Sequence, residues 1–295
     1  MIVNRYWQEI FGTGIVKTSE DFGIMGEPPT HEQLLDWLAA EYRDEGWDTK
    51  KLIKQIVMSA TYRQAALATK EKLEKDPANR LLSRGPRFRM DAEMVRDTAL
   101  AASNLLSEKV GGSSVHPYQP DGVWDVVGMP ESNTRNYKRD SGEALYRRSM
   151  YTFWKRAAPP VSMELFNAPT REVSCLRRER TNTPLQALVT LNDPQFVEAA
   201  RMLAQNAIEK SPDDAQRIDY IARRILSRSF TEKETAIVKK ILEDLLDTYN
   251  ANPDDAKALL NDGETKSDVK LNQAQLAAWT MVCNQVLNLD EALNK

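Results

Sequence analysis

The sequence has few of the residues that build disulfide, haem and metal sites. Its 295 residues include two cysteines, Cys175 and Cys283, and two histidines, His31 and His116. No CxxC or CxxCH motif occurs, which excludes covalent haem attachment and a disulfide framework, although it leaves open whether the two cysteines are free. The histidines lie far apart and have no ligand residues at helical spacing beside them, so we expect no metal site and no cofactor.

Long apolar runs and a strong net charge are also missing. No stretch approaches the roughly 18 apolar residues that cross a bilayer, so we expect no membrane span. The net charge is −3, which gives no general attraction to nucleic acid, and we expect no such partner. The first residues, MIVNRYWQEIFG, have no basic lead and no unbroken apolar core, unlike a signal peptide. As written, the chain is expected in the cytoplasm.

What is present is helical periodicity. Apolar residues recur every three or four positions over most of the chain, and no alternation of strands and helices appears, so the sequence predicts an all-α fold. We expect eight to ten helices in a multi-helix orthogonal bundle, including a helical hairpin at 31–63, and a polar loop at 250–268. The expected arrangement is a single domain over 1–295, with sub-regions at 1–106, 107–180 and 181–295.

Helix starts are marked by Thr and Asp residues that precede the apolar stripes, because their side chains accept hydrogen bonds from free backbone amides. Pro184 and Pro194 follow two of these caps at the first helical position, where proline is favoured. The expected caps are Thr30, Asp48 or Thr49, Asp91, Thr183, Asp193 and Thr231, with capping boxes closed by Gln33, Gln186 and Glu234.

The middle of the chain breaks this periodicity. Residues 107–145 contain the turn-forming pairs GG, HP, QP, DG and MP, together with Trp124 and Tyr137. A loop of this length is uncommon in a compact domain and is often functional. The stretch YRRSMYTFWKRAAPP at 146–160 fits a strand or a short helix, and its helical neighbours favour the helix. We therefore predict a long irregular insertion over about 107–180.

Positive charge is concentrated in this insertion. Residues 135–180 hold eleven Lys or Arg against five Asp or Glu, whereas residues 205–295 hold twelve against sixteen. Arginine binds carboxylate or phosphate through two parallel hydrogen bonds, and aromatic rings between the arginines could stack on sugars. The candidate ligand-binding residues are Arg147, Arg148, Trp154, Arg156, Arg177, Arg178 and Arg180. Alternatively, these arginines pair with acids of other helices and tie the loops to the bundle.

Two weaker candidates for catalysis stand elsewhere. The stretch DFGIMGEPPTHEQ brings Asp21, Glu27 and His31 close in sequence, and two carboxylates and an imidazole could carry out acid–base chemistry. The alternative is an ordered turn in which the carboxylates bind backbone amides. Cys175 lies among arginines, and cationic neighbours favour the reactive thiolate, but no histidine lies near it in sequence to act as a base.

Several long motifs together resemble the DUF1553 family, also called the planctomycete PSD1 domain. Because the motifs run from one end of the chain to the other, the resemblance covers nearly all of it. They are VNRYWQEIFGTGIVKTSEDFGIMGEPPTHEQLLDWLAAEYRDEGWDTKKLIKQIVMSATYRQ at 3–64, AEMVRD at 92–97, YRRSMYTFWKRAAPP at 146–160, RRERTNTPLQALVTLNDPQFVEAA at 177–200 and VLNLDEAL at 286–293.

The resemblance implies a family of unknown function. Its members are usually the C-terminal part of large exported proteins of Planctomycetes and related bacteria, which carry cytochrome c-like and DUF1549 domains upstream. Genes for sulfatase-like proteins often lie nearby, which suggests an association with polysaccharides. By this resemblance the chain is expected to be a fragment of such a parent and hence periplasmic or extracellular. The family provides no established catalytic residues.

Three functions follow as hypotheses, and whether the chain is an enzyme stays open. The first is an accessory module that binds an anionic carbohydrate or a partner domain through the arginine- and aromatic-rich insertion. The second is a glycan hydrolase that uses the carboxylates and the histidine near the N-terminus. The third is a structural partner of a cytochrome c-like electron-transfer domain.

Overall fold

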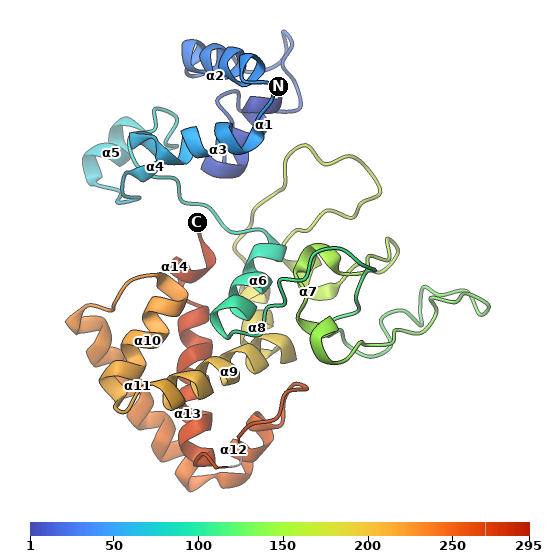
Figure 1. The fold of residues 1–295 in the computed structure, drawn as a ribbon, viewed down its shortest axis with the longest axis vertical. Helices are drawn as coiled ribbons and strands as arrows, with labels where there is room; N and C mark the ends of the chain where they lie inside the picture. Colours follow the sequence, from blue (N-terminus) through green and yellow to red (C-terminus); the bar gives the residue numbers. More distant parts are fainter. Residues whose placement is uncertain (269) are drawn as a thin grey trace. The chain divides into compact units, whose positions relative to one another are not determined.

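Helices dominate the computed structural model, which describes residues 1–268 and 270–295 (Figure 1). These residues form fourteen α-helices and two 3-10 helices, several of them a single turn long, and their only β-structure is four isolated bridges. The predicted all-α class is therefore confirmed. None of the helices in the described residues is both long and apolar enough to cross a membrane.

The chain divides into two compact units. The first contains residues 1–88, 174–178 and 295, and the second contains residues 89–173 and 179–294. The predicted sub-region boundary at 106 falls inside the second unit. The arginine-rich stretch at 171–180 contributes residues to both units, so its side chains are described below with the unit to which each belongs.

The first unit is built around a helical hairpin. Its apolar stripes meet as predicted, because Leu38 and Tyr42 of one helix and Leu52 and Ile56 of the next are buried in one cluster. Trp7 joins this cluster from the first helix. The predicted hairpin at 31–63 is confirmed. The helices of this unit are α1 (Ile2–Phe11), α2 (Glu32–Asp44), α3 (Thr49–Met58), α4 (Ala60–Arg63) and α5 (Lys70–Lys75).

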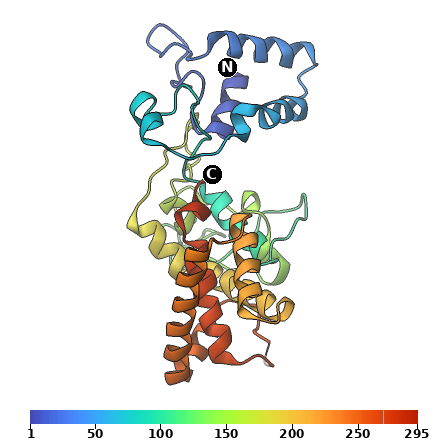
Figure 2. The same ribbon diagram turned by 90° about the vertical axis from the view of Figure 1, so that its left-hand side faces the viewer.

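The second unit holds the remaining helices, which gather around α9 and α13. Helix α11 runs beside α13, as Figure 2 shows from the side. They are α6 (Ala92–Ala102), η1 (Gly142–Tyr146), η2 (Ser149–Tyr151), α7 (Val161–Leu165), α8 (Pro184–Asn192), α9 (Pro194–Lys210), α10 (Asp214–Leu226), α11 (Glu232–Ala251), α12 (Pro253–Leu260), α13 (Gln273–Leu287) and α14 (Asp290–Leu293).

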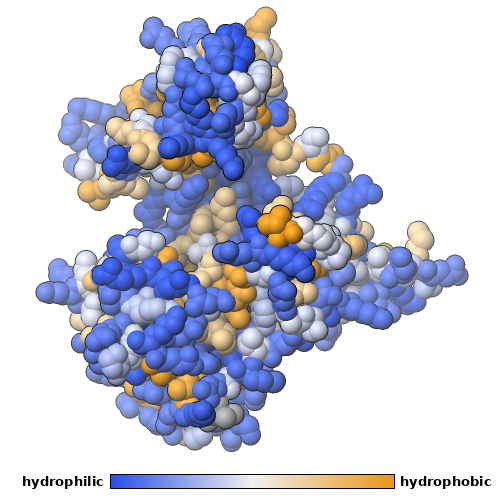
Figure 3. Space-filling model, in the orientation of Figure 1, coloured by the Kyte–Doolittle hydropathy of each residue, from blue (hydrophilic) through white to orange (hydrophobic). Residues whose placement is uncertain are grey.

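Small side chains explain why α9 and α13 form the centre. Ala200, Leu203 and Ala204 of α9 and Ala278 and Trp279 of α13 all have no exposed surface. Alanine lets the two backbones approach closely, and the larger Leu and Trp side chains fill the remaining space. Away from this core, the face of the second unit seen in Figure 3 is mostly hydrophilic, with separate hydrophobic patches.

Three predicted caps are confirmed by hydrogen bonds. Asp48 accepts from the amide of Lys51 at 3.0 Å. Asp193 accepts from the amide of Gln195 at 3.0 Å and starts α9 with Pro194 at the first position. Thr231 begins α11 with a complete capping box, whose members bond to each other in both directions. These caps depend only on neighbouring residues, which is why the sequence predicts them.

Two predicted capping boxes are wrong. Helix α2 is capped by His31 instead of Thr30, whose hydroxyl donates to the carbonyl of Ile15 at 3.3 Å. Thr183 stands at the start of α8 as predicted, but its side chain makes no cap bond. Gln186 is buried and donates to the carbonyl of Leu165 at 3.0 Å. In both cases a side chain that the local pattern assigned to a capping box bonds instead to a carbonyl distant in sequence, Thr30 to that of Ile15 and Gln186 to that of Leu165.

Two predicted segments are also wrong. Residues 146–160 form no α-helix, because their backbone groups bond to another segment of the insertion. The amide of Val115 donates to the carbonyl of Tyr151, and the amide of Phe153 donates to the carbonyl of Val115, both at 2.8 Å. The predicted loop at 250–268 contains α12, which starts at Pro253 and buries Ala256. Elsewhere the irregular insertion agrees with the prediction, since 107–180 holds only one short α-helix and two 3-10 helices.

Candidate functional site

A cavity of about 650 Å³ lies within the second unit. Its walls come from residues 118–121, Tyr137 and Arg139 of the insertion, from the start of α7, from the end of α8 and from the first residues of α9. This volume is in the range of small-molecule and cofactor pockets. The cavity therefore joins the turn-rich insertion to the helical core, at the place where α9 begins.

Asp193 is a half-buried acid of this cavity. The Asp-Pro pair places it at the cap of α9, where one carboxyl oxygen accepts from the Gln195 amide. Burial is the main influence and raises the pKa of Asp193 to about 6, while the Gln195 amide and the charge of Arg96 act in the opposite direction. Within the described residues no cation lies at ion-pair distance from this carboxyl. Asp193 is thus positioned to exchange a proton near neutral pH.

A buried arginine holds the residues behind Asp193. Arg96 of α6 is 3% exposed and donates from Nε to the side-chain oxygen of Gln195 at 2.7 Å. Its remaining nitrogens donate to the carbonyls of Leu145 and Arg147 at 2.6 and 2.9 Å. Burial lowers the pKa of Arg96, but these acceptors compensate the charge. The side-chain amide of Gln195 in turn donates to Ser162 Oγ at 3.3 Å, which orients a hydroxyl of the cavity wall.

Two tyrosines and one arginine form the opposite wall. Burial raises the pKa of both Tyr118 and Tyr137, so both phenols stay neutral. Their hydroxyls donate to protein acceptors, Tyr118 to Glu198 at 2.9 Å and Tyr137 to the carbonyl of Pro117 at 2.5 Å. The guanidinium of Arg139 lies 4.8 Å from the centre of the Tyr118 ring and 3.8 Å from a Glu264 oxygen.

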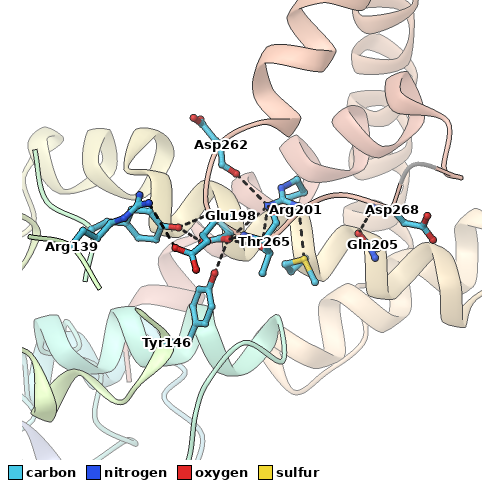
Figure 4. A network of polar contacts seen from close by, with 11 residues as sticks. Arg139, Tyr146, Glu198, Arg201, Gln205, Asp262, Thr265 and Asp268 are labelled. Carbon is cyan, nitrogen blue, oxygen red and sulfur yellow. Dashed lines mark hydrogen bonds and ion pairs between the residues drawn. The ribbon is translucent and has the colours of Figure 1, made fainter. Parts of the chain in front are cut away.

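A buried polar network centred on Glu198 and Arg201 stabilises this wall (Figure 4). Glu198 has no exposed surface and accepts hydrogen bonds from the hydroxyls of Tyr118 and Tyr146 at 2.9 Å and from the amide of Thr265 at 2.7 Å. Arg201, one turn along α9, lies 3.8 Å from Glu198 and donates to the carbonyl of Thr265 at 2.6 Å. The network thereby fastens the segment around Thr265 to α9 and fixes Tyr118.

Gly263 shows how tightly this segment is packed. Its φ is +86°, a region that favours glycine, and a Cβ at this position would lie 2.5 Å from Cδ of Glu198. Any larger residue would therefore displace the Glu198 carboxylate. Because the Glu198 carboxylate already accepts several hydrogen bonds from the protein, we assign the network a structural role.

Arg147, one of the predicted ligand-binding residues, acts within the fold. It is 6% exposed, and its nitrogens donate to the carbonyls of Lys109, Gly111 and Ser113 at 2.5 to 3.1 Å. Its guanidinium also stacks 3.8 Å from the centre of the Tyr151 ring. These contacts all lie within the insertion, so Arg147 holds parts of the insertion together without pairing with an acid of another helix.

The other predicted residues of the second unit have different surroundings. The indole nitrogen of Trp154 donates to the carbonyl of Thr170 at 3.0 Å, and Arg171 stacks 4.3 Å from its ring. Arg180 lies 3.5 Å from Asp91. Arg148 and Arg156 are exposed. None of these predicted residues is among those that line the cavity.

The first unit contains the remaining candidates. Arg177 lies 3.8 Å from Glu20, and Arg178 belongs to the same segment. The exposed thiol of Cys175 lies 3.2 Å from the carbonyl oxygen of Arg177. The seven predicted ligand-binding residues are thus divided between the two units.

The carboxylates and the histidine near the N-terminus are held locally. Asp21 accepts from the amide of Gly23 at 2.7 Å, as in the turn alternative. Glu27 lies 3.1 Å from Lys17, and His31 bonds to the hydroxyl of Thr30. No hydrogen bond or ion pair joins Asp21, Glu27 and His31 to one another in the described part of the chain. There, too, no group of three or more His, Cys, Asp or Glu residues could hold a metal.

The sequence marks the cavity only in part. Its Asp193-Pro194 pair predicts a helix start but not a buried acid, because burial depends on residues far away in the chain. The turn-rich stretch with Tyr137 is expected to be functional, and this stretch does line the cavity. Tyr118 and Arg139 carry no local signal that separates them from other residues of the insertion.

The comparisons with known proteins give one match. The family model described as "PSD1: Protein of unknown function (DUF1553)" matches residues 1–242, which includes residues of both units and every residue that lines the cavity. No curated protein and no solved structure matches the chain.

Proposed function

Because the chain belongs to the PSD1 (DUF1553) family, whose function is unknown, we propose a function from the cavity itself: it binds a carbohydrate, including one with an acidic group. The observation that carries this proposal is a cavity of about 650 Å³ that combines two tyrosines, one arginine and a half-buried acid. This volume accommodates a short oligosaccharide.

The polar groups of the cavity suit a ligand with many hydroxyls. Gln119 lines the cavity, and its side-chain oxygen is buried without a hydrogen-bond partner in the described residues. A buried acceptor of this kind is unfavourable until a ligand donor reaches it. Asp193 and Asn192 supply further donors and acceptors, while the rings of Tyr118 and Tyr137 supply flat apolar surface for a sugar ring.

Arg139 is the reason to expect an acidic group on the ligand. It is the one basic side chain among the residues that line the cavity, and 47% of its side chain is exposed. Its ion pair with Glu264 is long, at 3.8 Å, so a carboxylate or sulfate on the ligand could bind the same guanidinium through two hydrogen bonds.

A binding experiment tests this proposal. Neutral and acidic oligosaccharides of matched length are titrated into the protein by calorimetry, and at least one acidic member is expected to bind. Arg139→Gln should weaken the acidic ligand at least tenfold and leave a neutral ligand nearly unchanged. Arg156→Gln, an exposed arginine outside the cavity, is the matched control and should change neither. Absence of binding by every sugar contradicts the proposal, as does an equal effect of the two variants.

A second candidate, docking of a partner domain, is favoured by helix α8. Leu185, Leu188 and Leu191 are 54%, 57% and 36% exposed and follow one another at three-residue spacing on this helix. An exposed apolar stripe of this kind is typical of a protein interface. Replacing Leu185 and Leu191 by Ser should abolish co-elution with a DUF1549 or cytochrome c-like domain if that partner binds here. Unchanged co-elution would exclude the stripe as the docking surface.

A further inference from the structure

We propose that the cavity also hydrolyses glycosidic bonds, with Asp193 as the general acid and Asp121 as the general base. This inference rests on the carbohydrate binding proposed above and adds a reaction to it. Both carboxyl groups belong to residues that line the same cavity, Asp193 at the start of α9 and Asp121 in the turn before Gly122. Paired carboxyl groups on the two sides of a sugar are the usual machinery for this reaction.

The surroundings of Asp193 suit a proton donor. The carboxyl is held by the backbone amide of Gln195 at 3.0 Å and also interacts with the side chain of the same residue. Val161, Val189 and Pro194 line the cavity beside it and lower the local polarity. Burial correspondingly raises the pKa of Asp193 to about 6, so part of the population keeps its proton near neutral pH.

The surroundings of Asp121 suit the opposite role. Asp121 is exposed, and the turn that carries it leaves its carboxylate in contact with solvent. An exposed carboxylate at the edge of a sugar site can accept a proton from an attacking water molecule. The two acids therefore have different environments within one cavity, which is what separates an acid from a base.

Few other charges face Asp193. From α6, Arg96 acts through Gln195 and favours the ionised form. From the insertion, Arg139 is the remaining charged lining residue besides Asp121, while Tyr118 and Tyr137 are neutral. The lining residues from α7 and α8 carry no charge. The proton on Asp193 is thus controlled mainly by burial, then by the Gln195 amide and by Arg96.

The proposed reaction balances with water as the second reactant. The Asp193 carboxyl gives its proton to the oxygen of the glycosidic bond, and the bond from that oxygen to the anomeric carbon breaks. Water attacks the anomeric carbon and loses its proton to Asp121. The products are two shorter sugars, one with a new reducing end. Transfer of a proton from Asp121 to solvent and from solvent to Asp193 restores the starting state.

The test uses an oligosaccharide shown by calorimetry to bind the full chain. Incubation with wild-type protein is expected to release new reducing ends, at a rate that falls about tenfold per pH unit above pH 6. Asp193→Asn and Asp121→Asn should each lower the rate at least 100-fold while binding of the same sugar changes less than threefold. Asp125→Asn, an exposed acid of the same turn region outside the cavity, is the matched control and should keep the full rate.

The outcomes separate the two proposals. If no sugar binds, the proposed function fails and the reaction with it. If a sugar binds and wild-type protein releases no reducing ends over days, binding stands and the hydrolysis proposal is overturned. Equal rates for wild type and Asp193→Asn would also overturn it, because the acid would then lie elsewhere.

Discussion

Two acids, the half-buried Asp193 at the cap of α9 and the buried Glu198 within it, differ in how many hydrogen bonds their carboxylates accept. Glu198 is inaccessible and receives hydrogen bonds from two phenols and a backbone amide, with Arg201 beside it. Asp193, five residues earlier, is hydrogen-bonded by Gln195 alone, through its backbone amide and its side chain, and faces a cavity. The first acid has no capacity for a ligand, whereas the second does.

This difference separates an acid whose hydrogen bonds are all made within the protein from one that can still bind a ligand. A buried ion pair is stable only when hydrogen bonds replace the lost water, and the carboxylate of Glu198 meets that condition. A partly buried acid without an ion partner instead shifts its pKa and stays ready to exchange a proton. The number of partners, more than burial alone, therefore distinguishes Asp193 from Glu198.

Replacing Glu198 should have the largest effect on the free energy of unfolding. Glu198→Ala leaves Arg201 buried without its partner and removes the acceptor of Tyr118 and Tyr146, so we expect the free energy of unfolding to fall by about 3–5 kcal/mol. Chemical denaturation measures this change. Glu209→Ala, on the exposed part of the same helix, is the control and should change stability by less than about 0.5 kcal/mol. Similar losses for the two variants would contradict the structural role of Glu198.

Asp193 should instead control how the free energy of unfolding depends on pH. Asp193 has a folded-state pKa of about 6, above the ordinary value of 3.8. Between these values only the unfolded chain releases the proton, so the free energy of unfolding falls as the pH rises, by up to about 3 kcal/mol, and stays low above pH 6.

Asp193→Asn should remove this fall, because asparagine caps a helix as well as aspartate does. Denaturation at pH 4, 5.5 and 7 should therefore show that the free energy of unfolding of the variant increases relative to that of wild type as the pH rises. Asp213→Asn, at the exposed cap of α10, is the matched control and should give no such gain. Parallel curves for wild type and Asp193→Asn would show that folding does not raise the pKa of Asp193.

Two adjacent arginines extend the comparison to the insertion. Arg147→Ala removes hydrogen bonds to three carbonyls and the stacking on Tyr151, and should lower the free energy of unfolding by about 2–3 kcal/mol. Arg148→Ala, at an exposed position, should change it by less than about 0.5 kcal/mol. Thermal unfolding of the two variants measures the difference. Equal stabilities would mean that Arg147 does not hold the insertion.

The smallest effect is expected at the start of α11. Thr231 and Arg228 lower the pKa of Glu234 to about 2, Arg228 contributing most. Its stabilising contribution is present above the ordinary value of 4.5 and is lost as the pH falls towards 2. Because these side chains are more than a third exposed, we expect Glu234→Gln to cost only about 0.5–1 kcal/mol at pH 7. A difference from wild type that persists at pH 2 in denaturation experiments would contradict this assignment.

The sequence predicts those parts of the structure that depend on neighbouring residues. The stripe that contains Leu38 and Tyr42, the cap at Asp48 and the capping box of Thr231 all involve residues within one or two helical turns, and the structure confirms them. The predicted box at Thr183 is wrong because Gln186 bonds to the distant Leu165.

The candidate site depends on contacts that no local pattern contains. Gln195 is held by Arg96, 99 residues earlier, and Tyr118 by Glu198, 80 residues later. The arginines of the insertion are conspicuous in sequence, yet Arg147 uses its donors on nearby carbonyls. Charge density alone could therefore predict an important segment, but not which of its side chains remain available to a ligand.

The most direct test of the cavity as the functional site is a crystal structure of the full chain with an acidic oligosaccharide shown to bind it. The account predicts the sugar in the second unit, against Tyr118 and Tyr137, with its acidic group on Arg139 and a hydroxyl or bridging oxygen at Asp193. A sugar bound instead to Arg148 and Arg156, with the cavity free of ligand, would contradict it.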